Sequence, residues 1–190
     1  VYNGAKTIEK AINSLLSQTF KDFNLIISDN ASNDETESIC REFSQKDARI
    51  HYIRQTENIG LYKNENFLLG KATGKYFMFS CDDDWRSPDF LELNLAFLES
   101  NPNFVASTSP NCFEGEEKNP EKYVNFNLEG TLKERCVKFL QNSWVSHGIF
   151  FSLIRTEVLK DCKYLNFSYA GTDWSVNFFL LSKGKINRTK

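Results

Sequence analysis

Tyr76-Phe-Met-Phe-Ser-Cys-Asp-Asp-Asp84 is the stretch that decides the fold of this sequence. The apolar run from Tyr76 to Ser80 predicts a buried strand, and it passes directly into Cys81 and three aspartates. Neighbouring carboxylates repel one another, so their position at a strand end favours a bound cation. Mg²⁺ or Mn²⁺ suits such a site, because these ions take one or two protein carboxylates and complete their shell with water and phosphate oxygens. The alternative is a solvated acidic turn that caps the helix after Pro88.

Helices and strands alternate on both sides of this stretch. Apolar spacing, a Ser32/Glu35 capping box and the helix-starting Pro88 place the elements of the first half. Strands that alternate with helices predict an α/β fold with a mostly parallel, Rossmann-like sheet covered by helices on both faces. The predicted elements are helix Ala5–Gln18, strand Asn24–Asp29, helix Ser32–Phe43, strand Ile50–Arg54, helix Tyr62–Lys71, strand Tyr76–Ser80, a helix after Pro88 with Leu98 on its buried side, strand Phe104–Thr108, strand Tyr123–Leu128, helix Thr131–Gln141, strand His147–Ile154 and helix Asp173–Lys183.

Composition excludes several classes of protein. The 190 residues, 41% of them hydrophobic, suffice for one compact domain, and a net charge of −2 provides no basic field for nucleic acid, so we expect no nucleic-acid partner. The five cysteines include no C-x-x-C pair, so they suggest neither zinc nor a disulfide framework but a reducing cytoplasm. No apolar stretch reaches the roughly 20 residues that span a bilayer. We interpret the opening Val1-Tyr2-Asn3 as the end of a truncated first strand.

Polar residues gather where the predicted parallel strands end. Asn3, Asp29 and the aspartate run each close a strand, and ligands of such sheets bind beyond these ends. Asp29, Asn30 and Ser32 are suited to hydrogen bonds with a base or a ribose. The alternative for them is an Asx turn and a helix cap.

Several motifs follow one another over Val1–Leu98: Val1-Tyr2-Asn3, Ser14-Leu-Leu-Ser-Gln-Thr-Phe20, Ser28-Asp-Asn-Ala-Ser-Asn-Asp34, Asn58-Ile-Gly60 through Asn66, Ala72-Thr-Gly-Lys-Tyr76, and Asp82-Asp-Asp84 before Pro88. Gly171-Thr-Asp-Trp174 and Gly184-Lys-Ile186 follow further along the chain. In their order and spacing these motifs resemble the family 2 glycosyltransferases, which have the GT-A fold.

This resemblance implies one catalytic domain over residues 1–190, with a nucleotide-binding half (1–109) and an acceptor-binding half (110–190). It also implies inverting transfer of a sugar from a nucleoside-diphosphate donor, most often a UDP-sugar, to a hydroxyl of a glycan or lipid-linked acceptor. Surface polysaccharide synthesis in a bacterium, in the cytoplasm or at the inner face of the membrane, would be the setting. A basic run at Lys183, Lys185, Arg188 and Lys190 suits peripheral association with an anionic membrane, although a solvated terminus is the alternative.

The resemblance also assigns roles to single residues. Asp83 would be the direct ligand of Mn²⁺ or Mg²⁺, with Asp82 on the same metal and diphosphate motif. Asp173 would be the general base that takes the acceptor proton, and a simple N-cap of its helix is the alternative. Trp174 and His147 are candidates for acceptor contact. The residues expected to bind the donor nucleotide are Asn3, Asp29, Asn30, Asn58, Asn66 and Asp82.

Three positions depart from the family's pattern. Asn30 stands where a second aspartate is common, which alters donor and acceptor polarity at the base. Cys81 and Thr172 stand where acidic residues are common. Two other functions compete: a nucleotidyltransferase, for which Gly4-Ala-Lys-Thr7 is a poor phosphate loop, and a non-catalytic domain that binds a nucleotide-sugar or glycan.

Overall fold

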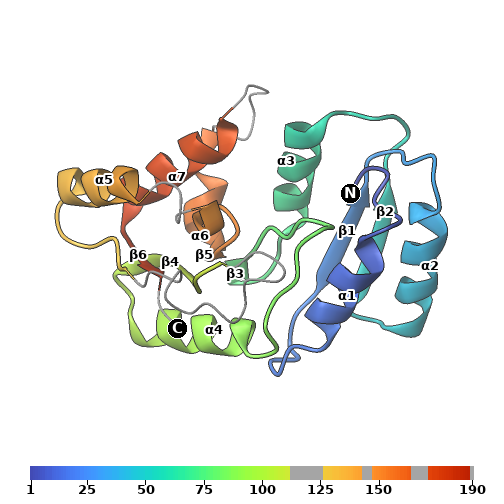
Figure 1. The fold of residues 1–190 in the computed structure, drawn as a ribbon, viewed down its shortest axis with the longest axis horizontal. Coiled ribbons are helices and arrows are strands. Elements are labelled where there is room, and N and C mark those ends of the chain that lie inside the picture. The colour runs from blue at the N-terminus through green and yellow to red at the C-terminus, as the bar shows by residue number, and fades with distance from the viewer. Residues whose placement is uncertain (112–125, 143–146, 164–170, 189–190) are drawn as a thin grey trace. The chain divides into compact units, whose positions relative to one another are not determined.

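Helices and strands alternate along the chain (Figure 1). The computed structural model describes residues 1–111, 126–142, 147–163 and 171–188. These fall into two compact units, which we describe separately: unit 1 holds residues 1–74 and 80–91, and unit 2 holds the described parts of 75–79 and 92–190. The elements are α1 Ile8–Leu16, β1 Leu25–Asp29, α2 Thr36–Lys46, β2 Ile50–Arg54, α3 Leu61–Lys71, β3 Tyr76–Phe77, α4 Phe90–Ser100, β4 Phe104–Thr108, α5 Leu132–Gln141, η3 His147–Ile149, β5 Leu153–Arg155, α6 Thr156–Lys160, α7 Thr172–Lys183 and β6 Lys185–Arg188.

Unit 1 is built on two parallel strands. β1 pairs with β2 in a register that runs from Leu25 opposite Ile50 to Asp29 opposite Arg54. Val1 lies along the other edge of β1: its nitrogen donates to the Ser28 carbonyl, and the Asn30 amide donates to the Val1 carbonyl. Burial of an aliphatic side chain contributes about 1.5–3 kcal/mol, so the shared core holds the helices on the sheet. That core consists of Ile8, Ile12, Ile27, Cys40 and Ile50.

Unit 2 contains a mixed sheet in the order β3-β5-β4-β6. β4 pairs parallel with β6 and antiparallel with β5, and every residue of β4 is buried. A chain of buried polar groups crosses this layer: the Asn187 amide donates to Ser107 Oγ at 2.8 Å, and the Ser107 hydroxyl donates to Asn94 Oδ1 at 2.7 Å. These bonds connect α4, β4 and β6 inside an otherwise apolar core.

The predicted α/β class is confirmed, and β2 and β4 span the residues expected for them. The sheets contain more antiparallel pairing than expected, since β5 lies antiparallel to both of its neighbours. The expected strand at Tyr76–Ser80 is confined to Tyr76–Phe77. The expected strand at His147–Ile154 is wrong in its first part, which forms a 3-10 helix. Of the strand expected at Tyr123–Leu128, residues 123–125 lie outside the described residues, and Leu128 forms an isolated antiparallel bridge with Ile186.

The capping box expected at Ser32 and Glu35 is also wrong. α2 begins at Thr36 with Glu35 as its N-cap, and the Glu35 side chain makes no cap bond, whereas Asp34 Oδ1 accepts the Thr36 amide at 3.0 Å. Ser32 Oγ instead accepts the Asn3 amide. A capping box exists at α5, where Thr131 Oγ1 accepts the Glu134 amide and the Glu134 carboxylate accepts the Thr131 amide. Such reciprocal bonds satisfy donors that the helix leaves unpaired at its start.

We expect Thr131→Ala to lower the free energy of unfolding by about 1 kcal/mol, because it removes the N-cap acceptor of α5. Urea unfolding of the intact protein measures this change. Glu35→Ala is the matched control at the start of α2, where the side chain makes no cap bond, and it should change stability by less than about 0.5 kcal/mol. Equal losses in the two variants would contradict the assignment.

Candidate functional site

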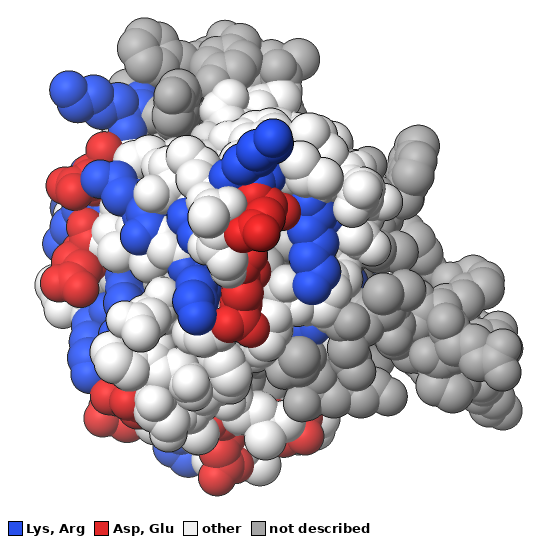
Figure 2. Space-filling model, turned by 90° about the vertical axis from the view of Figure 1, so that its left-hand side faces the viewer, with Lys and Arg blue, Asp and Glu red and all other residues white. Residues whose placement is uncertain are grey.

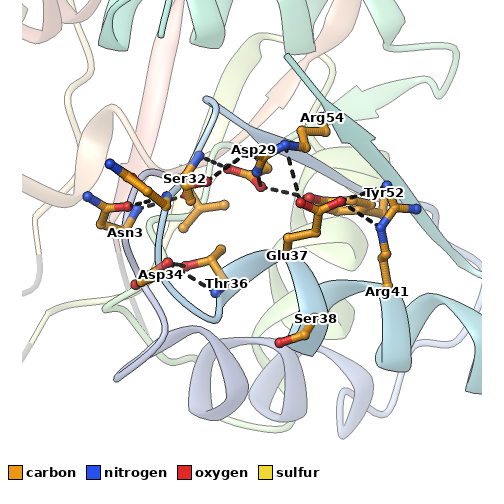
Figure 3. Close-up of polar contacts among 12 residues, drawn as sticks. Asn3, Asp29, Ser32, Asp34, Thr36, Glu37, Ser38, Arg41, Tyr52 and Arg54 are labelled. Atoms are coloured by element: carbon orange, nitrogen blue, oxygen red, sulfur yellow. Dashed lines mark hydrogen bonds and ion pairs between the residues drawn. The ribbon is translucent and has the colours of Figure 1, made fainter. Parts of the chain in front are cut away.

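Asp29 is buried at the end of β1 and has no exposed surface. Its Oδ1 accepts the Ser32 amide at 2.9 Å, and its Oδ2 accepts Tyr52 Oη at 2.7 Å and an Arg54 nitrogen at 2.8 Å (Figure 3). Burial by itself would raise the pKa of Asp29, but the bonds from Ser32, Tyr52 and Arg54 outweigh it and lower the pKa below its ordinary value. The carboxylate is therefore charged at neutral pH and is held by three donors, one from the loop after β1 and two from β2.

Asn30 connects the end of β1 to the start of α3. Its side-chain nitrogen Nδ2 donates to Asn58 Oδ1 at 2.9 Å, and its side-chain oxygen Oδ1 accepts the backbone amide of Ile59 at 2.9 Å. Asn58 Oδ1 also accepts the Gly60 amide at 2.9 Å. The structure thus brings together Asn30 and Asn58, which lie far apart in the sequence. Asn30 is buried, whereas Asn58 is exposed.

Two residues with left-handed backbone meet in this loop. Asn3 has φ 54° and Ala31 has φ 61°. The Asn3 amide donates to Ser32 Oγ, and Asn3 Oδ1 accepts the Asn33 amide, each at 2.9 Å. A left-handed conformation costs an L-residue other than Gly roughly 1–2 kcal/mol, so contacts from outside the loop must hold it. Asn3 is held by these two bonds of its own. Ala31 is held by the bonds that Asn30 and Ser32, on either side of it, make to Asn58 and Asn3.

The aspartate run follows in unit 1. The Asp82 carboxylate lies against Gly4, and a Cβ at position 4 would overlap Asp82 Oδ2, so only glycine permits this approach. Asp83 is exposed, whereas Asp84 pairs with Arg86 at 3.5 Å. Asp82 and Asp83 are thus the two carboxylates of the run that remain for a cation. The remaining predicted donor-binding residue, Asn66, is half-buried in α3.

Cys81 stands directly before the three aspartates. Burial and the charges of Asp84, Asp83, Asp82 and Glu65 raise the pKa of the Cys81 thiol to about 12, so the thiol stays neutral. Within the described residues no three His, Cys, Asp or Glu side chains form a metal-binding group. One or two carboxylates suffice for Mg²⁺ or Mn²⁺ when phosphate and water complete the shell. Asp82 and Asp83 therefore fit such an ion.

A small pocket lies between α1, β1 and residues 80–82 of unit 1. Aliphatic side chains such as Ile8, Ile12 and Leu25 line most of it, and Asp82 lies at its edge. Such a mostly aliphatic lining contains no basic side chain to bind a diphosphate, so this pocket belongs to the packing of α1 on β1. The polar groups that suit a nucleotide lie in the loops after β1 and β2.

Asp173 and Trp174 belong to unit 2. α7 begins at Thr172 with Gly171 as its N-cap, so the alternative of Asp173 as N-cap is wrong. Asp173 is exposed in the first helical turn. Trp174 packs edge to face on Phe139 with ring centroids 5.4 Å apart, which commits part of its indole ring to packing. His147 begins η3, and its side chain lies outside what the structure describes.

The basic run does not form an unopposed positive patch in the described residues. Lys183 pairs with Asp161 at 3.6 Å and Lys185 with Glu129 at 3.0 Å. Arg188 is buried over the Phe126 ring, and burial lowers its pKa to about 10. Basic and acidic side chains are interspersed on the face shown in Figure 2. No helix among the described residues is both long and apolar enough to cross a membrane.

Sequence reasoning missed Tyr52 and Arg54. Both side chains reach Asp29 from β2, and Arg54 also donates to the Ser32 carbonyl at 2.8 Å. A signal was present, because two parallel strands predicted to end at Asp29 and at Arg54 place these residues side by side.

Comparison with known proteins identifies the family. The family model described as Glycosyl transferase family 2 matches residues 1–162, and the chain belongs to this family. A relative in Campylobacter jejuni, the GalNAc(5)-diNAcBac-PP-undecaprenol beta-1,3-glucosyltransferase, is 31% identical over 168 residues, which are 86% of this chain and 52% of the relative. The chain spans about half, or less, of the length of such relatives.

Solved structures confirm the GT-A fold. Staphylococcus aureus TarS 1–349 in complex with UDP-GlcNAc has a TM-score of 0.78 at 22% identity and covers 99% of this chain and 53% of that chain. The mannosyltransferase PcManGT from Pyrobaculum calidifontis, in complex with GDP-Man and Mn²⁺, has a TM-score of 0.67 at 18% identity and covers 99% of this chain and 52% of that chain. The prediction from the sequence motifs is thus confirmed for both family and fold, while the assigned roles of single residues and the division at residue 109 stay predictions.

We expect Asp29→Asn to lower the free energy of unfolding by about 2–3 kcal/mol at pH 7, because it replaces a charged acceptor of three hydrogen bonds. The folded pKa of Asp29 is depressed, so its contribution is present above the unfolded pKa of about 3.9 and is lost as the pH falls through the folded pKa. Urea unfolding at several pH values should show the gap to wild type narrowing in acid. Asp22→Asn, at an exposed position, is the control. A gap that does not depend on pH would contradict the assignment.

Proposed function

We propose that this chain transfers a sugar from a nucleoside-diphosphate donor to a hydroxyl of a glycan or lipid-linked acceptor, with inversion at the anomeric carbon. The observation that carries the proposal is in unit 1, where the Asp82 carboxylate lies against Gly4 and Gly4 donates its amide to Thr36 beside the 30–34 loop. Gly4 thus contacts both Asp82, in the motif assigned to the diphosphate, and Thr36, which follows the motif assigned to the nucleotide. The family of the chain agrees with this chemistry.

The donor would bind beyond the ends of β1 and β2. Asn3 and Asn58 are exposed there, and Asp29 and Asn30 hold the loop beneath them. TarS in complex with UDP-GlcNAc supports a UDP-sugar as the donor, and Asn30 is the position at which this chain departs from the common aspartate pair. The exposed side-chain amides of Asn3 and Asn58, the loop backbone, and Asp29 and Asn30 beneath them would therefore contact the base.

Asp82 and Asp83 would hold a divalent cation against the diphosphate. PcManGT in complex with GDP-Man and Mn²⁺ supports this proposal. A bound Mn²⁺ or Mg²⁺ would stabilise the negative charge that develops on the departing nucleoside diphosphate. Arg86 already pairs with Asp84, which leaves two carboxylates to offset the two charges of the ion.

Asp173 would take the proton of the acceptor hydroxyl as that oxygen attacks. An exposed carboxylate in the first turn of α7 can reach an acceptor without the need to break a cap bond. Trp174 and His147 are proposed to contact the acceptor. Part of the Trp174 ring packs on Phe139, so sugar contact would use the remaining surface.

The proposed setting is surface polysaccharide synthesis in a bacterium, at the cytoplasmic face of the membrane and without nucleic acid as a partner. The printed name of the Campylobacter relative contains an undecaprenol-linked acceptor, which supports a lipid-linked one here. A nucleotidyltransferase is disfavoured, because the Gly4 amide is used by Thr36 and is not presented to a phosphate. If the chain were a non-catalytic binding domain, it would show no turnover. The variants described below distinguish this alternative from the proposed transferase.

We expect Asp83→Ala to lower kcat/KM by about 10²–10³-fold and to abolish the dependence of donor binding on Mn²⁺, because it removes a ligand of the cation that would offset the charge on the leaving diphosphate. The donor is first identified by a thermal-shift screen of nucleotide-sugars on the intact protein, with and without Mn²⁺. Calorimetry and initial rates then compare wild type, Asp83→Ala and the exposed control Asp89→Ala, which should behave as wild type. Metal-dependent binding that survives in Asp83→Ala would refute the ligand assignment.

We expect Asp173→Asn to lower kcat by about 10²–10⁴-fold, the contribution typical of a general base, while the donor Kd stays within about threefold. Glu157→Gln, an acid in the first turn of α6, is the matched control and should retain activity. Analysis of the product by NMR tests inversion of the anomeric carbon. A protein that binds donor but shows no turnover even as wild type would instead be the non-catalytic domain.

A further inference from the structure

Arg54 joins four parts of unit 1 at one guanidinium. Its nitrogens donate to Asp29 Oδ2 on β1 and to the Ser32 carbonyl in the loop, each at 2.8 Å, and one lies 3.3 Å from a carboxylate oxygen of Glu37 on α2 (Figure 3). Its own backbone ends β2. A planar guanidinium can make such divergent bonds at once, whereas a lysine ammonium is a single point charge.

The contact with the Ser32 carbonyl distinguishes this arginine from an ordinary ion pair. Residue 31, just before Ser32, has the left-handed backbone that L-residues disfavour. Other bonds also hold the loop: Ser32 N–H donates to Asp29 Oδ1, Asn33 N–H donates to Asn3 Oδ1, and Asn3 N–H donates to Ser32 Oγ. None of these three bonds involves a backbone carbonyl of the loop. Arg54 is the group that reaches this loop from the neighbouring strand and fixes its backbone carbonyl directly.

The remaining members of the cluster provide comparisons. Arg41 pairs with the same Glu37 at 2.8 Å and lies 5.2 Å from the centre of the Tyr52 ring, so it shares the partner but belongs to α2. Tyr52 donates to the same Asp29 oxygen as Arg54 does. If Arg54 served only as a counter-charge to Glu37, the loss of Arg41 would have a similar effect. If it served only as a donor to Asp29, the loss of the Tyr52 hydroxyl would have a similar effect.

We infer that Arg54 is a positioning residue for the donor: it holds the 30–34 loop in its left-handed conformation before the nucleotide binds, without itself taking part in the transfer. The part of this inference that concerns the donor rests on the proposed function. Preorganisation of a binding loop raises affinity, because the ordering entropy is lost on folding and not on binding. Loss of Arg54 should thus change donor affinity and leave the chemical step alone.

The experiment compares Arg54→Met with Arg41→Met and Tyr52→Phe in the intact protein. Hydrogen exchange without ligand is the first readout, and Arg54→Met should speed exchange of the Ser32 and Asn33 amides by about tenfold or more over both controls. The second readout is kinetic: Arg54→Met should raise the donor Kd and KM by about tenfold with kcat within about twofold, and Arg54→Lys should recover part of the loss.

Equal exchange in Arg54→Met and Arg41→Met would overturn the inference. Faster exchange with an unchanged donor Kd, or a fall in kcat with KM unchanged, would overturn its donor part. If wild type binds no nucleotide-sugar, the proposed function fails, and the exchange measurement still decides whether Arg54 positions the loop.

Discussion

The burial of the Asp29 carboxylate is the constraint on which the arrangement of unit 1 depends. A buried charge without partners is strongly unfavourable, so Asp29 can occupy the end of β1 only where donors converge on it. Two of those donors, Tyr52 and Arg54, come from β2, and the third is the backbone of the following loop. Strand pairing, loop conformation and the placement of the nucleotide motifs are thus coupled. The burial of Asp29 at the end of β1 therefore depends on the pairing of β1 with β2.

Much of the fold was predictable because hydrophobic period and turn residues agree. β2 and β4 are short apolar runs between polar turns, and their bounds follow from that pattern. The prediction failed at residues 147–154, where an apolar run without a clear period suits a strand and a tight helix equally well. β6 was missed because two basic residues, Lys185 and Arg188, bound this short segment directly after a helix, which suggested a solvated terminus.

The site was predictable to the level of which segments meet, but not of which side chains bond. The family motifs assigned Asn30 and Asn58 to one nucleotide site, and the structure joins their side chains by a hydrogen bond. The motifs did not predict that bond, because hydrogen-bond partners depend on loop geometry that no local pattern encodes. The Ser32/Glu35 pair illustrates the same limit: the residues fit a capping box, yet the Asn3 amide, from a distant segment, takes the Ser32 hydroxyl. Tertiary contacts outweighed the local preference.

In unit 2, the buried chain from Asn187 through Ser107 to Asn94 has a consequence for how the sheet avoids alternative pairings. The residues of β4 are all buried, so the hydrophobic effect alone discriminates weakly between neighbouring alignments of that strand. If β4 shifted by one residue against β6, Ser107 would point to the opposite face of the sheet. The side-chain amides of Asn94 and Asn187 would then lose this hydrogen-bond partner inside a buried layer. The buried hydrogen bonds of Ser107 therefore favour the native alignment of β4 with β6, because a shift by one residue would leave buried amide groups without these partners.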